Sequence, residues 1–301
     1  SVAEAGRRHL NEDLFRQYMS CEANDQTIVP GDGPAETGGH DTGEGSNNWV
    51  VGGSRTTSGK PILATDPHNS VDLSRQWYQA QLTVPGLDAI GAFFLGTPGI
   101  YLGHTRHAAW GVTNHTASAR DVYVETPGDD VGCYIDGDHS RSFECIDERI
   151  VVSDDEDVDF AIQLTSRGPL IQDFVPAVDD TNPLLSLKWN GSEPTTGFES
   201  MLALLRSSSA DDVVGALRQW PFPILNFLYA DDAGHIGYHV AGHVPERSVA
   251  RRGYKLPHDP DDAWVGTYAF DGLPQLNDPK RDWVASANNP PWGGDRPYLY
   301  L

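Results

Sequence analysis

The sequence changes character abruptly at Gly45–Ser46, and this boundary limits the fold more than any other feature. Residues 22–45 are rich in Gly, Asp, Glu and Thr and poor in apolar side chains, so they cannot bury enough surface to fold alone. Residues 49–51 (Trp-Val-Val) and 62–64 (Ile-Leu-Ala) are β-formers, and the polar segment 56–61 between them is typical of a turn. We therefore expect a β-hairpin that starts at Ser46, directly after a polar linker.

A serine in this position can supply its own general base once the chain is cut before it. A serine hydroxyl is a weak nucleophile that needs a base. Cleavage between Gly45 and Ser46 would give Ser46 an α-amino group, whose ordinary pKa of about 7.7–8.0 leaves a useful fraction neutral near neutral pH. Ser46 is thus a candidate N-terminal nucleophile, and the alternative for an isolated Gly-Ser pair is a plain loop serine.

The residues from Ser46 onward resemble the start of the β chain in the penicillin acylase family. The matching stretches are 46–51 (SNNWVV), 53–55 (GSR), 58–61 (SGKP) and 66–68 (DPH). This family includes penicillin, cephalosporin and acyl-homoserine-lactone acylases and has the N-terminal nucleophile hydrolase fold. The resemblance implies an α+β chain of four layers, with two stacked antiparallel sheets between helices. It also implies self-cleavage at Gly45–Ser46 and hydrolysis of the amide bond in small N-acylated molecules.

The same resemblance assigns catalytic roles beyond Ser46. His68 would orient the amino group and hydroxyl of the serine. The backbone N–H of Asn114 and the side-chain amide of Asn226 would donate hydrogen bonds to the oxyanion of the tetrahedral intermediate. Arg247 would help to position the catalytic groups. The alternative for His68 is a purely structural histidine. For Asn114 it is a plain strand end, for Asn226 an asparagine that caps a strand hydrogen bond, and for Arg247 a surface salt bridge.

Substrate and metal contacts are also implied by the resemblance. Leu102 matches an apolar position of the acyl pocket, whereas Asn69 stands where the family often has an apolar residue. The sequence therefore does not identify the acyl group of the substrate. Asp121 matches a residue that helps to bind a structural calcium ion in some members, and a carboxylate suits that cation. Ser118, however, replaces an acidic ligand. Segment 285–290 resembles a further family strand that ends near the active site, and its expected role here is scaffolding.

The resemblance divides the chain at the processing site. Residues 1–45 are expected to be the tail of the α chain, including an amphipathic helix within 1–20, followed by the linker. Residues 46–301 are expected to be the first part of the β chain. The remainder of both chains, from the same precursor, and a small-molecule amide substrate are the expected partners. Apolar periodicity predicts two helices within 197–220, and alternating apolar residues predict a hairpin within 225–238.

The charge of the chain excludes one class of function. The 301 residues carry a formal net charge of −22, from 43 acidic and 21 basic residues, so a protein that tracks nucleic-acid phosphates is not expected. Lysine occurs only at positions 60, 188, 255 and 280, which favours a salt-adapted organism. No apolar run is long enough to span a membrane. We expect an extracellular or cell-envelope protein.

The cysteines leave two alternatives open. Cys133 and Cys145 flank a short segment that is typical of a hairpin, so they could form a disulfide in an oxidising compartment or remain two free thiols. Cys21 has no partner in either case. No Cys-x-x-Cys pair is present in the sequence, which argues against a cysteine zinc site.

Two hypotheses compete with an active amidase. The chain starts without an initiator Met or an apolar signal segment and is expected to be an internal or truncated piece. It could therefore be an inactive relic, or an acidic secreted binding protein that keeps only the scaffold. A serine hydrolase with an internal Ser-His-Asp triad is a further alternative, but the sequence has no Gly-x-Ser-x-Gly motif.

Overall fold

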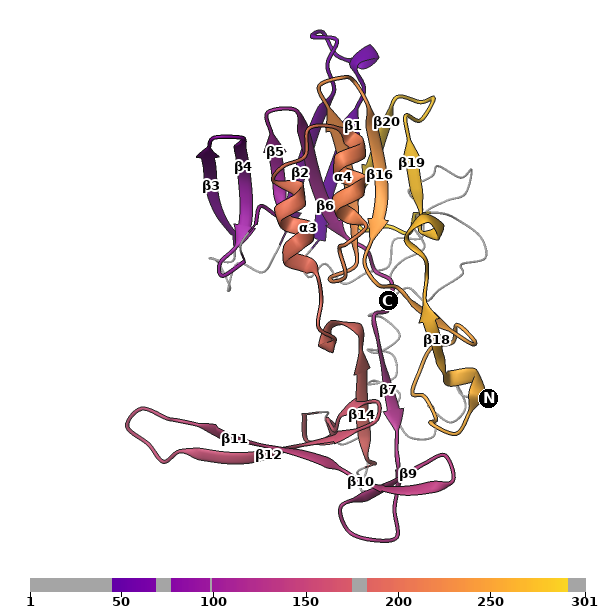
Figure 1. Cartoon of the computed structure of the whole chain (residues 1–301). Helices are drawn as coiled ribbons and strands as arrows, with labels where there is room; N and C mark the ends of the chain where they lie inside the picture. Colours follow the sequence, from indigo (N-terminus) through magenta and orange to yellow (C-terminus); the bar gives the residue numbers. More distant parts are fainter. Residues whose placement is uncertain (1–44, 69–76, 98, 175–182, 292–301) are drawn as a thin grey trace. The chain divides into compact units, whose positions relative to one another are not determined.

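A computed structural model describes residues 45–68, 77–97, 99–174 and 183–291 (Figure 1). These residues form two compact units, each assembled from separate stretches of the chain. The larger unit comprises 45–117, Gly191–Val244 and 267–291, and the smaller unit comprises Ser118–Asn190 and Pro245–Gly266. The predicted helix within 1–20 and most of the predicted linker lie outside the described residues, so the predicted division at Gly45–Ser46 stays a prediction.

A seven-stranded antiparallel sheet forms the centre of the larger unit (Figure 1). Its strand order is β19–β16–β15–β6–β5–β4–β3. In that order the strands span Gln275–Asn277, Ile236–Ala241, Leu225–Asp231, Ala108–Asn114, Leu102–Thr105, Leu87–Phe94 and Trp77–Val84. β15 and β16 are buried at every residue and pair through a tight turn, which confirms the predicted hairpin.

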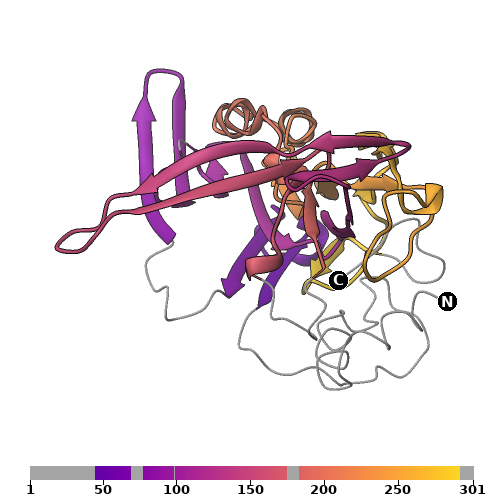
Figure 2. The same cartoon turned by 90° about the horizontal axis from the view of Figure 1, so that it is seen from below.

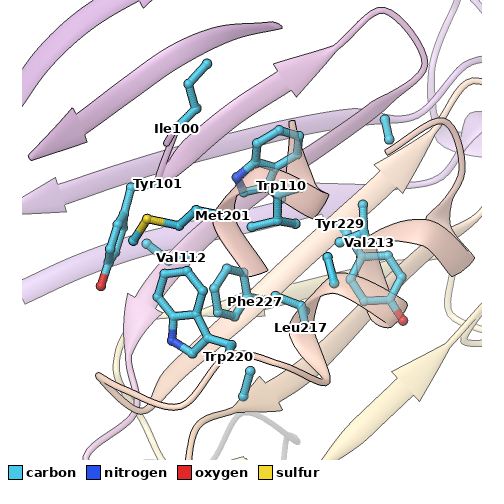
Figure 3. Close-up of a cluster of buried hydrophobic side chains, with 14 of the residues drawn as sticks. Ile100, Tyr101, Trp110, Val112, Met201, Val213, Leu217, Trp220, Phe227 and Tyr229 are labelled. Atoms are coloured by element: carbon cyan, nitrogen blue, oxygen red, sulfur yellow. The ribbon is translucent and has the colours of Figure 1, made fainter. Parts of the chain in front are cut away.

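Two helices cover one face of this sheet, as expected from the apolar periodicity. They are α3 (Gly197–Leu204) and α4 (Ala210–Leu217), which Figure 2 shows end-on and side by side. The Ser209 hydroxyl accepts a hydrogen bond from the Asp212 N–H at 3.1 Å and caps α4. Large apolar side chains fill the space between helices and sheet, and each such buried side chain contributes roughly 1.5–3 kcal/mol (Figure 3). They include Tyr101, Trp110, Leu217, Trp220 and Phe227.

A second, three-stranded sheet packs on the opposite face. Its order is β2–β1–β20, with β1 at Gly45–Val51, β2 at Ile62–His68 and β20 at Trp283–Ser286. The predicted hairpin is therefore confirmed, with the short 3-10 helix η1 (Gly53–Arg55) in its turn. The two sheets approach so closely that a Cβ at Gly111 of β6 would lie 2.8 Å from Asn48 Oδ1. Helices and stacked antiparallel sheets confirm the α+β class.

The smaller unit consists almost entirely of short antiparallel pairs. β7 (Arg120–Val124) pairs with β14 (Leu185–Trp189), and β17 (Pro245–Arg247) pairs with β18 (Trp264–Thr267). Two three-stranded sheets complete it: β10–β9–β8, at His139–Ser142, Cys133–Asp136 and Thr126–Pro127, and β11–β12–β13, at Glu144–Ile150, Val158–Thr165 and Gly168–Pro169. The other 3-10 helices among the described residues are η3 (Gln172–Phe174), η4 (Asn190–Ser192), η5 (Pro260–Asp262) and η6 (Phe270–Gly272).

The structure decides between the two alternatives for the cysteines. Cys133 and Cys145 are free thiols, and the Cys133 sulfur lies 3.6 Å from the Ser142 hydroxyl across the β9–β10 pair. Cys21 lies outside the described residues. Among the helices that the structure describes, none is both long and apolar enough to cross a membrane.

Candidate active site

Ser46 lies at the start of β1, on the side of the second sheet that faces the seven-stranded sheet. Its side chain is only 9% exposed, and its hydroxyl donates a hydrogen bond of 2.6 Å to the carbonyl oxygen of Gly45. In the uncut chain the Ser46 nitrogen is an amide that cannot accept a proton. The hydroxyl thus lies against the carbonyl group of the peptide bond that the sequence analysis predicts to be cut.

His68 flanks the same peptide bond from the neighbouring strand. It stands directly opposite Gly45 in the β1–β2 pair, and its Nδ1 lies 3.9 Å from the place where a Cβ on Gly45 would be. The hydrogen bond that the structure gives its ring is with Asp66, at 2.9 Å from Nε2 to Oδ2. The structure therefore brings His68 next to the peptide bond predicted to be cut, while its predicted role in orienting Ser46 stays a prediction.

Asn226 is a polar side chain in the middle of the apolar strand β15, and it is completely buried. Its Oδ1 accepts hydrogen bonds from the Tyr238 hydroxyl at 2.6 Å and from His115 Nδ1 at 2.9 Å. Its Nδ2 donates to Thr113 Oγ1 at 3.0 Å and to the Asn114 carbonyl oxygen at 3.1 Å. A buried amide needs hydrogen-bond partners, and these neighbouring residues supply four.

The backbone N–H of Asn114 does not bond to the backbone of β15. Hydrogen-bonded and non-hydrogen-bonded pairs alternate along an antiparallel ladder, and the N–H of His115 donates to the Ile224 carbonyl at 3.1 Å. Asn114, one residue earlier and opposite Leu225, is then at a non-hydrogen-bonded position. Its N–H is therefore not engaged by the backbone of β15, and its predicted donation to an oxyanion stays a prediction.

Asn288 belongs to this site, although the sequence analysis expected only scaffold there. Its Nδ2 donates to the Asn114 carbonyl oxygen at 2.9 Å, and its Oδ1 lies 3.7 Å from the place of a Cβ on Gly45. Asn288 follows β20 in a left-handed conformation with φ of 65°, which asparagine adopts more readily than most residues. The only sequence signal for it is an asparagine pair just after a strand.

The network around Asn226 carries no net charge. The His115 ring is buried, and this burial lowers its pKa to about 4, so the imidazole is neutral near neutral pH. Thr113 Oγ1 lies 2.7 Å from Ser286 Oγ, which extends the network to β20. The larger unit thus places His68 and Asn288 close to Gly45, and neutral hydrogen bonds link Asn288, Asn114 and Asn226 to one another.

Arg247 and Asp121 form a buried ion pair in the smaller unit. Arg247 Nε donates to Asp121 Oδ2 at 2.7 Å, and Arg247 Nη2 donates to the Ser118 carbonyl oxygen at 3.0 Å. Both side chains are almost fully buried, so the alternative of a surface salt bridge is wrong. The predicted role of Arg247 beside the catalytic groups stays a prediction.

The contacts of Asp121 do not favour a calcium ion there. Its Oδ2 also accepts a hydrogen bond from Trp264 Nε1, so this oxygen already has a cationic and a neutral donor. Within the described part of the chain, no group of three or more His, Cys, Asp and Glu residues is arranged to hold a metal. Calcium binding at Asp121 stays a prediction that requires ligands from elsewhere.

The two predicted pocket residues are not tested by the structure. Leu102 lies on β5, is partly buried and packs against the apolar cluster between the sheet and the helices. Asn69 lies outside the described residues. The acyl pocket therefore stays a prediction.

Comparisons with known proteins show what this chain is similar to in sequence. The profile of the penicillin amidase family matches residues 2–301. Similar curated proteins include "Penicillin acylase 2 proenzyme" of Pseudomonas sp. (strain SE83), 29% identical over 257 residues that cover 85% of this chain and 33% of the relative. Acyl-homoserine lactone acylase QuiP of Pseudomonas aeruginosa is 26% identical over 261 residues, covering 81% of this chain and 30% of the relative.

A solved structure shows the same fold. Thermostable penicillin G acylase from Alcaligenes faecalis matches with a TM-score of 0.73 and 24% identity, covering 85% of this chain and 46% of that chain. The chain spans about a third of the length of the curated relatives that it matches.

Proposed function

Because the chain belongs to the penicillin amidase family, we propose that it is the nucleophile-bearing part of an amidohydrolase. Its substrates are small N-acylated molecules of the penicillin or acyl-homoserine-lactone type, as the names of its relatives suggest. The observation that carries the proposal is the position of Ser46, whose hydroxyl lies 2.6 Å from the Gly45 carbonyl oxygen at the start of β1.

Self-cleavage would create the catalytic base. The Ser46 hydroxyl attacks the Gly45 carbonyl carbon, and the C–N bond breaks as the Ser46 nitrogen takes up a proton, which leaves an ester between Gly45 and Ser46 Oγ. Water then hydrolyses this ester, releasing a carboxyl group on Gly45 and a free α-amine on Ser46. The contact between the hydroxyl and the carbonyl group supports the first step, and Gly45 leaves the carbonyl unobstructed.

The mature site would use the same serine on an external amide. Ser46 Oγ attacks the substrate carbonyl while the α-amine accepts its proton and passes it to the leaving amine. The Asn114 N–H and the Asn226 amide stabilise the oxyanion, and water finally releases the acid from the acyl-enzyme. Loss of one such donor typically lowers kcat by about 10²–10³-fold.

One feature of the hydrogen bonds allows Asn226 to take part. Both hydrogens of its Nδ2 are engaged in the uncut chain, one of them by the Asn114 carbonyl oxygen. That oxygen also accepts from Asn288 Nδ2. Asn226 can therefore turn one hydrogen to an oxyanion without leaving the Asn114 carbonyl unpaired, which would otherwise cost roughly 1–3 kcal/mol.

The proposal includes partners and a location. The remainder of the α and β chains, from one precursor, completes the enzyme, and calcium binding is kept only as a prediction at Asp121. We also place the protein outside the cytoplasm of a salt-adapted organism, and the net charge of −22 supports this.

The test is the fate of the Gly45–Ser46 bond in the full-length precursor. Intact mass and N-terminal sequencing should show a new chain that begins Ser46-Asn47-Asn48-Trp49. Ser46→Ala should remain one chain and be inactive, because it lacks the hydroxyl, whereas Ser58→Ala, in the exposed turn of the hairpin, should be cut and active. A wild-type precursor that stays uncut yet hydrolyses N-acyl amides would refute the mechanism. A wild-type precursor that is uncut and inactive would favour an inactive scaffold.

A further inference from the structure

We infer that Tyr238 and His115 are positioning residues that fix the orientation of the Asn226 carboxamide, so that its amino end faces the proposed oxyanion. The inference rests on the proposed function and deepens it. It concerns how the larger unit prepares Asn226, which none of the comparisons with known proteins addresses.

The polarity of the Asn226 carboxamide follows from its neighbours. The atom beside the Asn114 carbonyl oxygen must be nitrogen, because a carbonyl only accepts hydrogen bonds. The other end is then oxygen, and it receives the Tyr238 hydroxyl and His115 Nδ1. Since that oxygen only accepts, His115 carries its proton on Nδ1. Rotation of the carboxamide by 180° would place oxygen against oxygen at Asn114.

Tyr238 and His115 hold the carboxamide from the two strands that flank β15. Tyr238 is on β16, two residues from Val240, which stands directly opposite Asn226. His115 follows β6, the strand on the other side of β15. All three side chains are buried, where hydrogen bonds are stronger than in water and polar groups rarely lack partners. The carboxamide is therefore fixed at its oxygen end by two donors from two different strands.

The hydrogen bonds from Tyr238 and His115 matter most when Asn226 exchanges its bond to the Asn114 carbonyl for one to an oxyanion. If one hydrogen of Nδ2 turns from Asn114 to an oxyanion, the bond that defined the polarity of the carboxamide is lost. The donors on Oδ1 are then the groups that keep the amino end directed at the oxyanion. Preorganised donors of this kind act because they need no reorganisation during the reaction. Loss of the Tyr238 hydroxyl should thus lower kcat more than it raises KM.

The larger unit offers a matched control for Tyr238. Tyr229 lies on the adjacent strand β15 and is buried to the same extent, with 2% exposed for each residue. Its hydroxyl donates to an asparagine as well, but to Asn277 instead of Asn226. Tyr229→Phe and Tyr238→Phe each remove one buried hydroxyl from a packed ring. Only the second change touches the carboxamide of Asn226.

The experiment measures kcat and KM of the complete, processed enzyme on an N-phenylacetyl amide that releases a coloured amine. We expect Tyr238→Phe to lower kcat at least roughly tenfold with little change in KM, as a fraction of the loss from deleting an oxyanion donor. Tyr229→Phe should stay within about twofold of wild type. Equal kcat for the two variants would overturn the inference. Thermal melts of both show whether folding accounts for a difference.

Three further variants keep the test decisive. His115→Asn retains an N–H donor close to the Nδ1 position, so it should keep more activity than His115→Ala, and equal loss in both would count against positioning. Asn226→Ala separates this inference from the proposed function. If Asn226→Ala keeps the wild-type kcat, the oxyanion role itself fails. If it is inactive while Tyr238→Phe matches Tyr229→Phe, only the positioning role fails.

Discussion

Each unit contains a buried polar cluster, and the two clusters are built from opposite kinds of groups. In the larger unit, Asn226 is surrounded by a phenol, an imidazole, a hydroxyl and a backbone carbonyl, all of them neutral. In the smaller unit the cluster is made of charged side chains, among them Asp121, Arg247, Lys255 and Asp262. A neutral donor can be redirected to a new acceptor at small cost, whereas a buried ion must keep its partner.

The ions of the smaller unit are tied to one another in fixed pairs. Arg251 Nε lies 2.7 Å from Asp262 Oδ1, and Lys255 Nζ lies 3.7 Å from the same oxygen. Lys255 is only 1% exposed, and burial lowers the pKa of its ammonium group. The backbone N–H of Leu256 donates to the other oxygen of Asp262 at 2.8 Å. This arrangement holds segments of the smaller unit together through charged groups that are paired with one another.

The comparison therefore assigns different tasks to the two clusters. The neutral network is suited to catalysis, because its hydrogens can move to a developing oxyanion. The ionic cluster is suited to fixing the position of chain segments far apart in sequence, such as Asp121 and Arg247. Variants of both clusters test whether the neutral network serves catalysis and the ionic cluster serves stability.

The largest effect is expected from breaking the buried ion pair. Arg247→Leu leaves the Asp121 carboxylate buried without its cation and should lower the free energy of unfolding by about 3–5 kcal/mol. Asp121→Leu combined with Arg247→Leu should lose less than the single change, because no unpaired charge remains. Tyr238→Phe, which removes one neutral hydrogen bond, should cost only about 0.5–1.5 kcal/mol. Urea denaturation of the three variants gives the values, and a loss in Tyr238→Phe as large as in Arg247→Leu would refute the division.

Much of the larger unit could be predicted from the sequence, because its signals are local. The β1–β2 hairpin, the two helices and the β15–β16 hairpin each follow from apolar spacing and turn residues within about twenty positions. An asparagine among the apolar residues of 225–230 needs buried hydrogen-bond partners. The identity of those partners could not be predicted, since Thr113 and His115 are more than a hundred residues away along the chain.

The smaller unit shows why other parts could not be predicted. Its strands are short, and β10 and β11 are exposed at every residue, so they lack the apolar alternation that marks a strand in sequence. The Asp121–Arg247 pair joins residues 126 positions apart. The contact of Asn288 with Asn114 was not predicted for a similar reason, because it spans 174 positions and no local sequence pattern indicates it.

An intermediate effect is expected from the pH dependence of the neutral network. The pKa of His115 is lowered to about 4 by burial, against about 6.5 when unfolded. Between these values the unfolded chain binds a proton that the folded chain does not, so stability falls as the pH drops, by at most about 1.4 kcal/mol per pH unit. His115→Asn should show a smaller loss between neutral and mildly acidic pH in urea titrations.

His235 provides the control of opposite sign. This histidine is exposed, and its hydrogen bond with Asp278 raises its pKa, so the stability that it contributes is present in acid and lost as the pH rises. His235→Asn should therefore lose stability relative to wild type at mildly acidic pH. A His115→Asn variant with the same acid sensitivity as wild type would show that the imidazole is not kept neutral by burial.

The smallest effect should separate surface charge from buried charge. With a net charge of −22, the folded surface repels itself. Salt shortens the Debye length from about 10 Å at 0.1 M to about 3 Å at 1 M, which screens exposed charges but hardly affects buried pairs. We therefore expect the Tm to rise with potassium chloride up to the molar range, by about 2–4 °C for each kcal/mol gained.

The double variant Asp121→Leu/Arg247→Leu should gain as much as wild type, because its missing pair is buried. A Tm that stays flat or falls would contradict the expected self-repulsion, and a much larger gain in the double variant would show that the ion pair is not shielded from salt.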